Sequence, residues 1–295
     1  GAAGLSNILA FCNMDWIREA WGQEPTDDWT IEDFVDCMTA CVKLKGKGYF
    51  GSNVAKGGSV EAECWVRNWG GAYLDPEGVT SLFAEEKCQD AIKWLREQLA
   101  NGNFPGRDDA AEGETTMFFS QKQAIIISNP GASQGMVKGA EDNGYELGVF
   151  LAPKGKSAME TPPRRGFGPY ANCFSIYAKT KYPSEAFGLM LRVLSVESFK
   201  WICMQTGRQP GALLDTWYEP EVVAKFPWFP KVADIMRACK EPYPMPGNTR
   251  YAEWADVGEN EIQPLIYGEA EYNQANIDLV NDHLQEILDL PVPGA

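Results

Sequence analysis

The chain contains a single histidine, His283, and this excludes most chemistry that depends on imidazole. A Ser-His-Asp catalytic set and a Cys/His zinc site both need histidine beside defined partners, and His283 stands between Asp282 and Leu284 in a segment typical of a helix. No Walker sequence for phosphate occurs, and the many carboxylates do not single out the acid pair of a glycosidase. We therefore expect no catalytic residue, no metal site and no cofactor.

Basic residues and long apolar runs are also scarce. The chain has 26 Lys and Arg against 41 Asp and Glu, a formal net charge of −15, which would repel the phosphates of a nucleic acid. No apolar run approaches the ~18 residues that a membrane span requires. We expect a globular chain with no nucleic-acid partner and no membrane span. Its 295 residues are enough for two lobes with separate cores.

None of the eight cysteines forms a Cys-x-x-Cys pair. Cys37 and Cys41 are four residues apart on a predicted helix, where a direct bridge is geometrically awkward. We expect most of the cysteines to be small buried hydrophobic residues, with one or two bridges. The cysteines alone leave the redox compartment open.

Short apolar runs and capped amphipathic segments alternate along the chain, as in an α/β fold. Thr30 and Asp33 have the spacing of a capping box before an apolar stripe. Strands are predicted at 8–12, at 124–127, where the run is continuously apolar, and at 145–153. The stripe of the first helix is Ile31, Phe34, Val35, Met38 and Val42, and that of the last helix is Ile277, Val280, Leu284, Ile287 and Leu288.

The segment from Gly168 to Pro210 has a distinctive order of elements. A glycine-rich turn precedes an alternating, aromatic strand predicted over Cys173–Ala178. Ser184 is placed to cap one helix, and Ser195-Val-Glu197 begins a second that Gly207 and Pro210 end. The apolar residues of this segment include Phe174, Ile176, Phe187, Leu191 and Leu194.

This order resembles the return segment of extracellular solute-binding proteins of ABC importers, the group that includes the maltose-binding protein. Pro25-Thr26 before Trp29 and Phe34, and Met117-Phe-Phe119 before Ala124, resemble further landmarks of that group, although Gln121-Lys122-Gln123 stands where a glycine is usual. The resemblance implies an α/β, periplasmic-binding-protein-like two-lobe fold of type II, which binds its ligand without chemistry.

The resemblance begins at the first crossing between lobes, so the opening βαβ units of the first lobe, on the order of a hundred residues, have no counterpart. It implies a complete C-terminal lobe, from 1–166 and 214–290, and a fragment of the N-terminal lobe, a strand-helix-helix segment at 168–213. The apolar faces of that fragment need cover. Gly1-Ala-Ala-Gly-Leu5 has neither an initiator Met nor the features of a signal peptide. We expect a partial chain or a remainder supplied by another chain; a rebuilt, smaller lobe is the alternative.

By the same resemblance, ligand contacts come from the crossings and the loops that line the cleft. An aromatic is usual after the Gly-Pro of one such loop, and Asn129-Pro130-Gly131 has none. Trp254 is therefore the expected stacking aromatic, with Arg250 and Asn129 as hydrogen-bond partners. The predicted ligand-binding residues are Asn53, Asn129, Pro130, Gly131, Tyr170, Asn172, Arg250 and Trp254.

The resemblance implies the substrate-binding subunit of an ABC transporter, which captures a sugar or oligosaccharide between its lobes and passes it to permease subunits. Ten tryptophans and eleven tyrosines suit stacking on sugar rings. Arg208 and Arg250 also allow an acidic sugar. Another small solute, such as a polyamine or a chelated metal, remains open, as does, less favoured, a carbohydrate-active enzyme. The expected location is periplasmic or extracellular, with a lipid anchor possible in the full-length protein.

Overall fold

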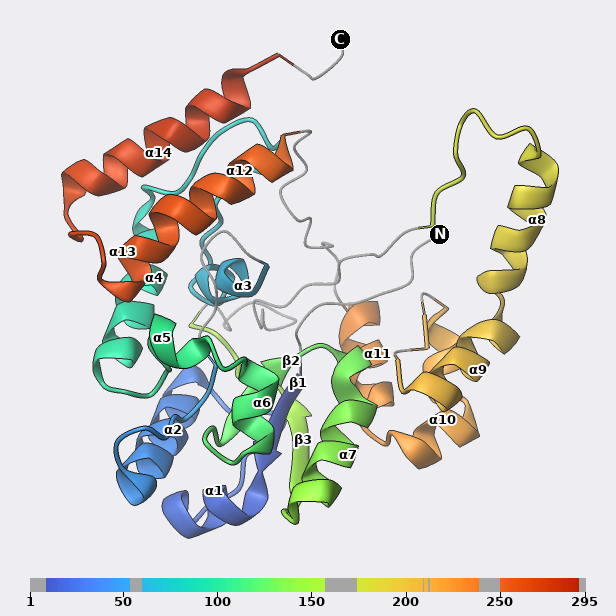
Figure 1. Ribbon diagram of the computed structural model, residues 1–295, viewed down its shortest axis with the longest axis horizontal. Helices are drawn as coiled ribbons and strands as arrows, with labels where there is room; N and C mark the ends of the chain where they lie inside the picture. The colour runs from blue at the N-terminus through green and yellow to red at the C-terminus, as the bar shows by residue number, and fades with distance from the viewer. Residues whose placement is uncertain are drawn as a thin grey trace.

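The computed structural model describes residues 9–53, 60–156, 174–208, 210–211, 213–238 and 250–291. Its described strands form a three-stranded sheet in the order β2-β1-β3 (Figure 1). The central strand β1 (Leu9–Asn13) is buried throughout and runs antiparallel to both β2 (Ile125–Ser128) and β3 (Leu147–Leu151). The three strands predicted from apolar runs are confirmed, each within two residues of its expected start.

The register of the sheet brings three chain segments to one edge. Leu9, the first residue of β1, pairs with Ser128 at the end of β2 and with Leu151 at the end of β3. We call this the Leu9 edge. The segments that follow β2 and β3 therefore leave the sheet where the segment before β1 enters it, while Asn13 lies at the opposite end.

Helices surround this small sheet. The helices before residue 157 are α1 (Met14–Trp21), α2 (Ile31–Lys45), α3 (Val60–Asn68), α4 (Glu86–Ala100), α5 (Arg107–Ala110), α6 (Glu114–Phe119), the 3-10 turn η1 (Pro130–Ala132) and α7 (Ser133–Asn143). The later ones are α8 (Pro183–Val193), α9 (Val196–Thr206), the 3-10 turn η2 (Leu214–Tyr218), α10 (Pro220–Lys225), α11 (Phe229–Ala238), α12 (Tyr251–Val257), the π-helical η3 (Gly258–Ile262), α13 (Gln263–Tyr267) and α14 (Gln274–Asp289). In Figure 1, α8 and α9 lie on the opposite side of the molecule from α12 and α14.

The capping box of α2 forms as the spacing predicts. Thr30 Oγ1 accepts a hydrogen bond from Asp33 N at 3.2 Å, and Asp33 Oδ2 accepts one from Thr30 N at 2.8 Å. The expected apolar stripe is only partly correct, because Val35 and Val42 are half-buried. The buried face of α2 consists of Ile31, Phe34, Cys37, Met38 and Cys41. The two cysteines take the core positions because one helical turn separates them along that face.

The described cysteines behave as small core residues, as expected. Cys12, Cys37, Cys41 and Cys203 are buried free thiols, and Cys64 and Cys88 are buried too. A hydrogen bond with Cys41, followed by burial, raises the pKa of the Cys37 thiol, and burial raises that of Cys12. The expected one or two bridges are not found among these six; Cys173 and Cys239 lie outside the described residues.

The strand expected over Cys173–Ala178 is wrong for its described part, because residues 174–178 are not in a strand. A strand requires a neighbour to pair with, and the described sheet ends at β2 and β3, with no partner for this segment. The expected cap at Ser184 is also wrong. Helix α8 begins two residues earlier than a cap at Ser184 would place it, at Pro183, whose fixed φ suits the first helical position, and Tyr182 precedes it without a side-chain cap.

The second helix of this segment is confirmed. Ser195 caps α9 through a hydrogen bond from Ser198 N to its Oγ at 3.2 Å. Gly207 ends the helix with φ of +68°, a left-handed conformation that glycine adopts without strain. Phe199 and Cys203 of α9 are buried, and α9 packs against α10 and η2. This packing runs across the lobe boundary expected at 213/214.

Helix α8 has no buried residue, although its sequence is largely apolar. Leu189 is 66% exposed and Leu191 55% exposed. Trp201 of the neighbouring α9 is 63% exposed. The large apolar side chains exposed in residues 174–213 are Phe174, Tyr177, Tyr182, Phe187, Leu189, Leu191, Val196, Trp201 and Leu213. A concentration of this size on one segment is typical of a covered surface.

The capping box gives a first test of the local structure. Replacing Thr30 with Ala is expected to lower the free energy of unfolding by about 1 kcal/mol, because the backbone N–H groups at the start of α2 lose an acceptor. Thr115→Ala, at an exposed position inside α6, is the matched control and is expected to change it by less than about 0.5 kcal/mol. Urea denaturation measures both, and equal effects of the two substitutions would contradict the role of the cap.

Candidate functional site

The loop that follows β2 lies at the Leu9 edge and begins with Asn129. The carbonyl of Asn129 accepts a hydrogen bond from Ala132 N at 3.0 Å, which starts the 3-10 turn η1, and α7 follows directly. Ser133 N in turn donates to Pro130 O, so the backbone N–H groups of Ala132 and Ser133 are both used within the turn. Pro130 is buried, Asn129 and Gly131 are half-buried, and no described residue hydrogen-bonds the side-chain amide of Asn129. That amide can donate to and accept from a ligand hydroxyl.

Asn53 lies beside the same strand but uses its side chain on the backbone. Its Oδ1 accepts from Ile127 N at 2.9 Å, and its Nδ2 donates to Ile127 O and to Glu114 Oε2, both at 3.3 Å. Asn53 is only 4% exposed. The amide thereby prolongs the pairing of β2 and fixes the carboxylate of Glu114 near the Leu9 edge. In this arrangement Asn53 positions the edge and has little capacity left for a ligand.

Glu114 also influences Tyr267, a half-buried aromatic that the sequence did not single out. Burial, and next the charge of Glu114, raise the pKa of Tyr267 to about 12. Tyr267 therefore keeps its phenolic proton at neutral pH and can donate a hydrogen bond. Its position in α13, directly before Gly268, resembles an ordinary helix end, so no local pattern marks it.

Residues 131–135 read Gly-Ala-Ser-Gln-Gly, the Gly-x-Ser-x-Gly pattern of a nucleophile elbow, and they follow a strand. The structure gives Ser133 a different role. Its side chain is fully buried, its Oγ donates to Pro130 O at 2.7 Å, and it accepts from Trp228 Nε1 at 2.9 Å. His283 pairs instead with Glu261, at 2.9 Å. Ser133 thus joins α7 to the segment before α11, and its hydrogen-bond partners in the described part of the chain include no base that could activate it.

Trp228 is the aromatic that the structure brings to this loop. Its ring is half-buried and its indole nitrogen is held by Ser133. Next to it, Lys225 Nζ donates to Gln134 Oε1 at 3.2 Å and to Met204 O at 2.8 Å. The C-terminal end of α9 and the start of α7 therefore meet beside Asn129. Only the fold brings Trp228 here, since it lies almost a hundred residues further along the chain.

The structure does not support the expected roles of Arg250 and Trp254. Trp254 is 1% exposed, and its ring packs against Tyr73 with centroids 5.6 Å apart, so no face is open for stacking on a ligand. It is buried because the core side of α12 lies against the segment before α4. Arg250 donates to both carboxylate oxygens of Glu253 at 2.7 Å and to Pro291 O at 2.6 and 3.1 Å. These bonds hold the end of α14 against α12.

Two predicted residues, Tyr170 and Asn172, lie outside the described residues. Of the eight predicted positions, the structure therefore brings Asn53, Asn129, Pro130 and Gly131 together at the Leu9 edge. In the described ranges, no three His, Cys, Asp or Glu side chains gather in a way that could hold a metal ion. No helix in the same ranges has the length and apolar character to cross a membrane.

Comparison with known proteins places the fold. No family model and no curated protein matches the sequence. Among solved structures, the chain is similar to UgpB from Mycobacterium tuberculosis in complex with glycerophosphocholine, with a TM-score of 0.78, 18% identity, and coverage of 98% of this chain and 71% of that one. It is similar to an ABC transporter solute-binding protein from Agrobacterium radiobacter K84 in complex with ribitol, with a TM-score of 0.75, 20% identity, and coverage of 97% and 70%.

The GacH receptor of Streptomyces glaucescens, solved unliganded and with acarbose, gives a TM-score of 0.74 at 15% identity over 97% of this chain and 70% of that one. At these identities the likeness establishes the fold. The chain has the type II periplasmic-binding-protein fold, with a mostly helical body around a small sheet, and spans about 70% of the solved chains.

The role of Asn53 can be tested by stability. Asn53→Ala is expected to lower the free energy of unfolding by about 1–3 kcal/mol, because the N–H and C=O of Ile127 lose their partner in a buried place. Asn101→Ala, at the exposed end of α4, is the control and is expected to change it by less than about 0.5 kcal/mol. The measurement is urea denaturation, and wild-type stability in Asn53→Ala would show that the amide does not support the edge.

Proposed function

We propose that this chain, with its type II periplasmic-binding-protein fold, is the substrate-binding part of an ABC importer and captures a sugar, an oligosaccharide or a polyol. The observation that carries the proposal is the likeness to solute-binding proteins along 97–98% of the chain. Those solved with ribitol, D-mannitol and acarbose hold ligands rich in hydroxyl groups. In capture of this kind, the ligand favours the closed state because it contacts both lobes there, and no covalent bond is made or broken.

The Leu9 edge supports the same proposal. Asn129 offers an amide without a partner among the described residues, and Trp228 offers a half-buried aromatic ring. Amides and aromatic faces are the groups that recognise hydroxyls and the C–H faces of sugar rings. We propose Asn129, Gly131 and Trp228 as ligand contacts, with Tyr170 and Asn172 retained from the sequence. No catalytic step belongs to this function, which ends with delivery to permease subunits outside the cytoplasm.

We also infer that α8 and the start of α9 belong to the other lobe. Helix α8 has an apolar surface that no described residue buries, as expected of a helix whose packing partners lie outside the described residues. The solved solute-binding proteins have additional chain, about 30% of their length, that this chain does not cover, and half a lobe is about that size. The body formed by the sheet and helices α1 to α7 and α12 to α14 is then the C-terminal lobe. The unit of η2, α10 and α11 packs between the two.

Ligand binding is tested by thermal shift against maltose, ribitol, mannitol and glycerophosphocholine at millimolar concentrations. Binding at a hundred times the dissociation constant adds roughly 2.7 kcal/mol to stability, which raises the midpoint visibly. The expected result is stabilisation by at least one of these solutes, which chromatography recovers unchanged. Consumption of the solute would favour an enzyme, and no shift with any hydroxyl-rich solute would contradict the proposal. Because part of one lobe has no counterpart here, we expect affinity well short of nanomolar.

The contact residues are tested in the same assay. Asn129→Ala is expected to weaken binding roughly tenfold, the equivalent of about 1.4 kcal/mol, because the ligand loses a hydrogen-bond partner. Asn101→Ala serves again as the matched control, with unchanged affinity. Equal affinity of the two variants would remove Asn129 from the site.

The exposure of α8 is tested by a double substitution, Leu189→Glu with Leu191→Glu. Because both side chains face solvent, the melting midpoint is expected to stay within a few degrees of wild type, while binding of a hydrophobic dye falls. Phe199→Glu, at a 4% exposed position of α9, is the contrasting variant and is expected to unfold the surrounding unit. A large destabilisation by the double substitution would mean that α8 is already packed in this chain.

A further inference from the structure

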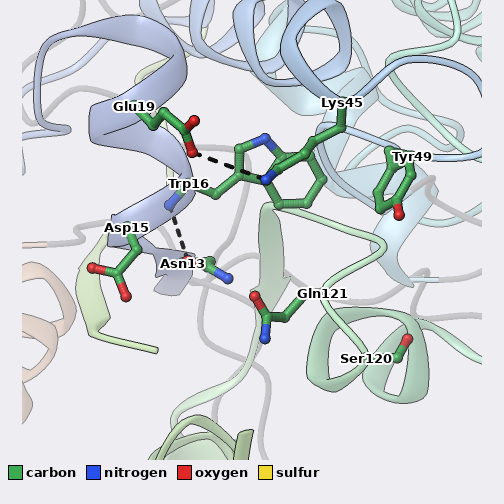
Figure 2. Close-up of a pocket in the computed structure, with 8 residues that line it drawn as sticks. All are labelled: Asn13, Asp15, Trp16, Glu19, Lys45, Tyr49, Ser120 and Gln121. Atoms are coloured by element: carbon green, nitrogen blue, oxygen red, sulfur yellow. Dashed lines mark hydrogen bonds and ion pairs between the residues drawn. The ribbon is translucent and has the colours of Figure 1, made fainter. Parts of the chain in front are cut away.

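A concave site lies at the end of the sheet opposite the Leu9 edge. It is a cavity of about 250 Å³ where β1 passes into α1, beside the end of α2 and the turn after α6 (Figure 2). At about 30 Å³ for each water, it has room for roughly eight water molecules, enough for one small molecule and too little for an oligosaccharide. Its lining residues are Asn13, Asp15, Trp16, Glu19, Lys45, Tyr49, Ser120 and Gln121.

Asn13 brings an unused hydrogen-bond donor to this cavity. The residue is 1% exposed, and its Oδ1 caps α1 by accepting from Trp16 N at 3.1 Å. Its Nδ2 is buried without a hydrogen-bond partner, and Figure 2 shows that nitrogen directed toward the space between Trp16 and Gln121. A buried donor without an acceptor is destabilising, and an occupant with an acceptor oxygen would remove that penalty.

The other residues that line this cavity provide hydrogen-bond acceptors and two aromatic rings in contact. Asp15 accepts from Glu146 N through Oδ2 only, and Glu19 lies 3.9 Å from Lys45 Nζ. Trp16 and Tyr49 meet edge to face with centroids 5.9 Å apart, and Tyr49 is 38% exposed. The site therefore combines one unsatisfied donor, carboxylate oxygens with capacity to accept, and an accessible ring.

Gln121 adds a further polar group at some conformational cost. It has φ of +58°, the one positive value at a non-glycine position among the described residues. That left-handed conformation is unfavourable for a residue with a side chain and free of strain for glycine. In the solute-binding proteins that this sequence resembles, a glycine is usual where Gln121-Lys122-Gln123 stands here. The glutamine side chain lines the cavity and donates to Asn143 O at 3.2 Å, which leaves its carbonyl oxygen available.

The charges of the site select the class of ligand. Two carboxylates against one ammonium disfavour an anion. A simple cation has no lone pair for the donor of Asn13. A neutral molecule with neighbouring hydroxyl groups satisfies both, because each hydroxyl accepts one hydrogen bond and donates another. We propose that this cavity, the Asn13 pocket, binds a small neutral polyol or monosaccharide. The proposal does not rest on the function proposed for the Leu9 edge, since the two sites lie at opposite ends of β1.

The test uses the whole chain labelled with ¹⁵N and titrated with sorbitol. Hydrogen bonding to the ligand is expected to shift the Asn13 side-chain amide resonance, together with the Trp16 indole resonance. Asn13→Asp assigns the first signal and removes the donor while it keeps the oxygen that caps α1. It is expected to weaken binding at least tenfold and, because the new carboxylate is buried beside Asp15 and Glu19, to lower the melting midpoint, so affinities are compared at a temperature where both proteins are folded. Asn101→Asp is the charge-matched control, with affinity as in wild type.

Two further variants separate the possible outcomes. Gln121→Gly is expected to raise the melting midpoint, since the turn is relieved, and to weaken sorbitol binding. Asn129→Ala is expected to leave the Asn13 and Trp16 shifts unchanged, which distinguishes this pocket from the Leu9 edge. Sulfate and tetramethylammonium serve as anion and cation probes that should not move either resonance. Sorbitol shifts absent from Asn13 and Trp16 up to saturating millimolar concentrations, or equal affinity in Asn13→Asp and wild type, would overturn the proposal.

Discussion

The antiparallel pairing of β1 with two neighbours is the constraint on which the rest of the molecule depends. Because Leu9 lies opposite both Ser128 and Leu151, the segments after β2 and β3 must leave the sheet beside the segment that enters β1. A shift of one residue would turn the buried side chains of β1 to the other face. Because both faces of β1 are buried, such a shift would exchange side chains between two packed surfaces, and the observed register fixes the position of Asn129 and the start of α7.

The asparagine amides at the two ends of β1 are hydrogen-bonded in different ways. At the Leu9 edge, Asn53 uses its amide to complete the pairing of β2, and the half-buried loop at Asn129 is left with groups suited to a hydroxyl-rich solute. At the Asn13 end, the cap of α1 uses one atom of an amide and leaves the other directed into a cavity. The same residue type thus closes hydrogen bonds at one place and presents a donor at another, according to what the neighbouring backbone already satisfies.

Local signals in the sequence predicted local structure well. The Thr30 capping box, the Ser195 cap and the stop at Gly207 all involve residues within one helical turn of each other, so their geometry is decided by nearby chain. Predictions that needed distant partners fared worse. Residues 174–178 are not a strand because no described neighbour pairs with them, and Trp254 is buried because Tyr73, far away in sequence, packs on its ring. The resemblance drew attention to the loop after β2, but it did not indicate that the indole of Trp228 lies beside that loop.

By itself, the sequence determined the acidic character of the chain, the presence of a single histidine, the positions of the three described strands and the helix ends at Thr30, Ser195 and Gly207. These follow from composition and from interactions between close neighbours along the chain. Tertiary structure decided which amides are used and which remain open, which aromatic rings face the core, and that α8 carries an apolar surface with no described cover. The physical reason is that burial and hydrogen-bond satisfaction are properties of a place in the fold, and a residue's neighbours in space are set only when the whole chain has packed.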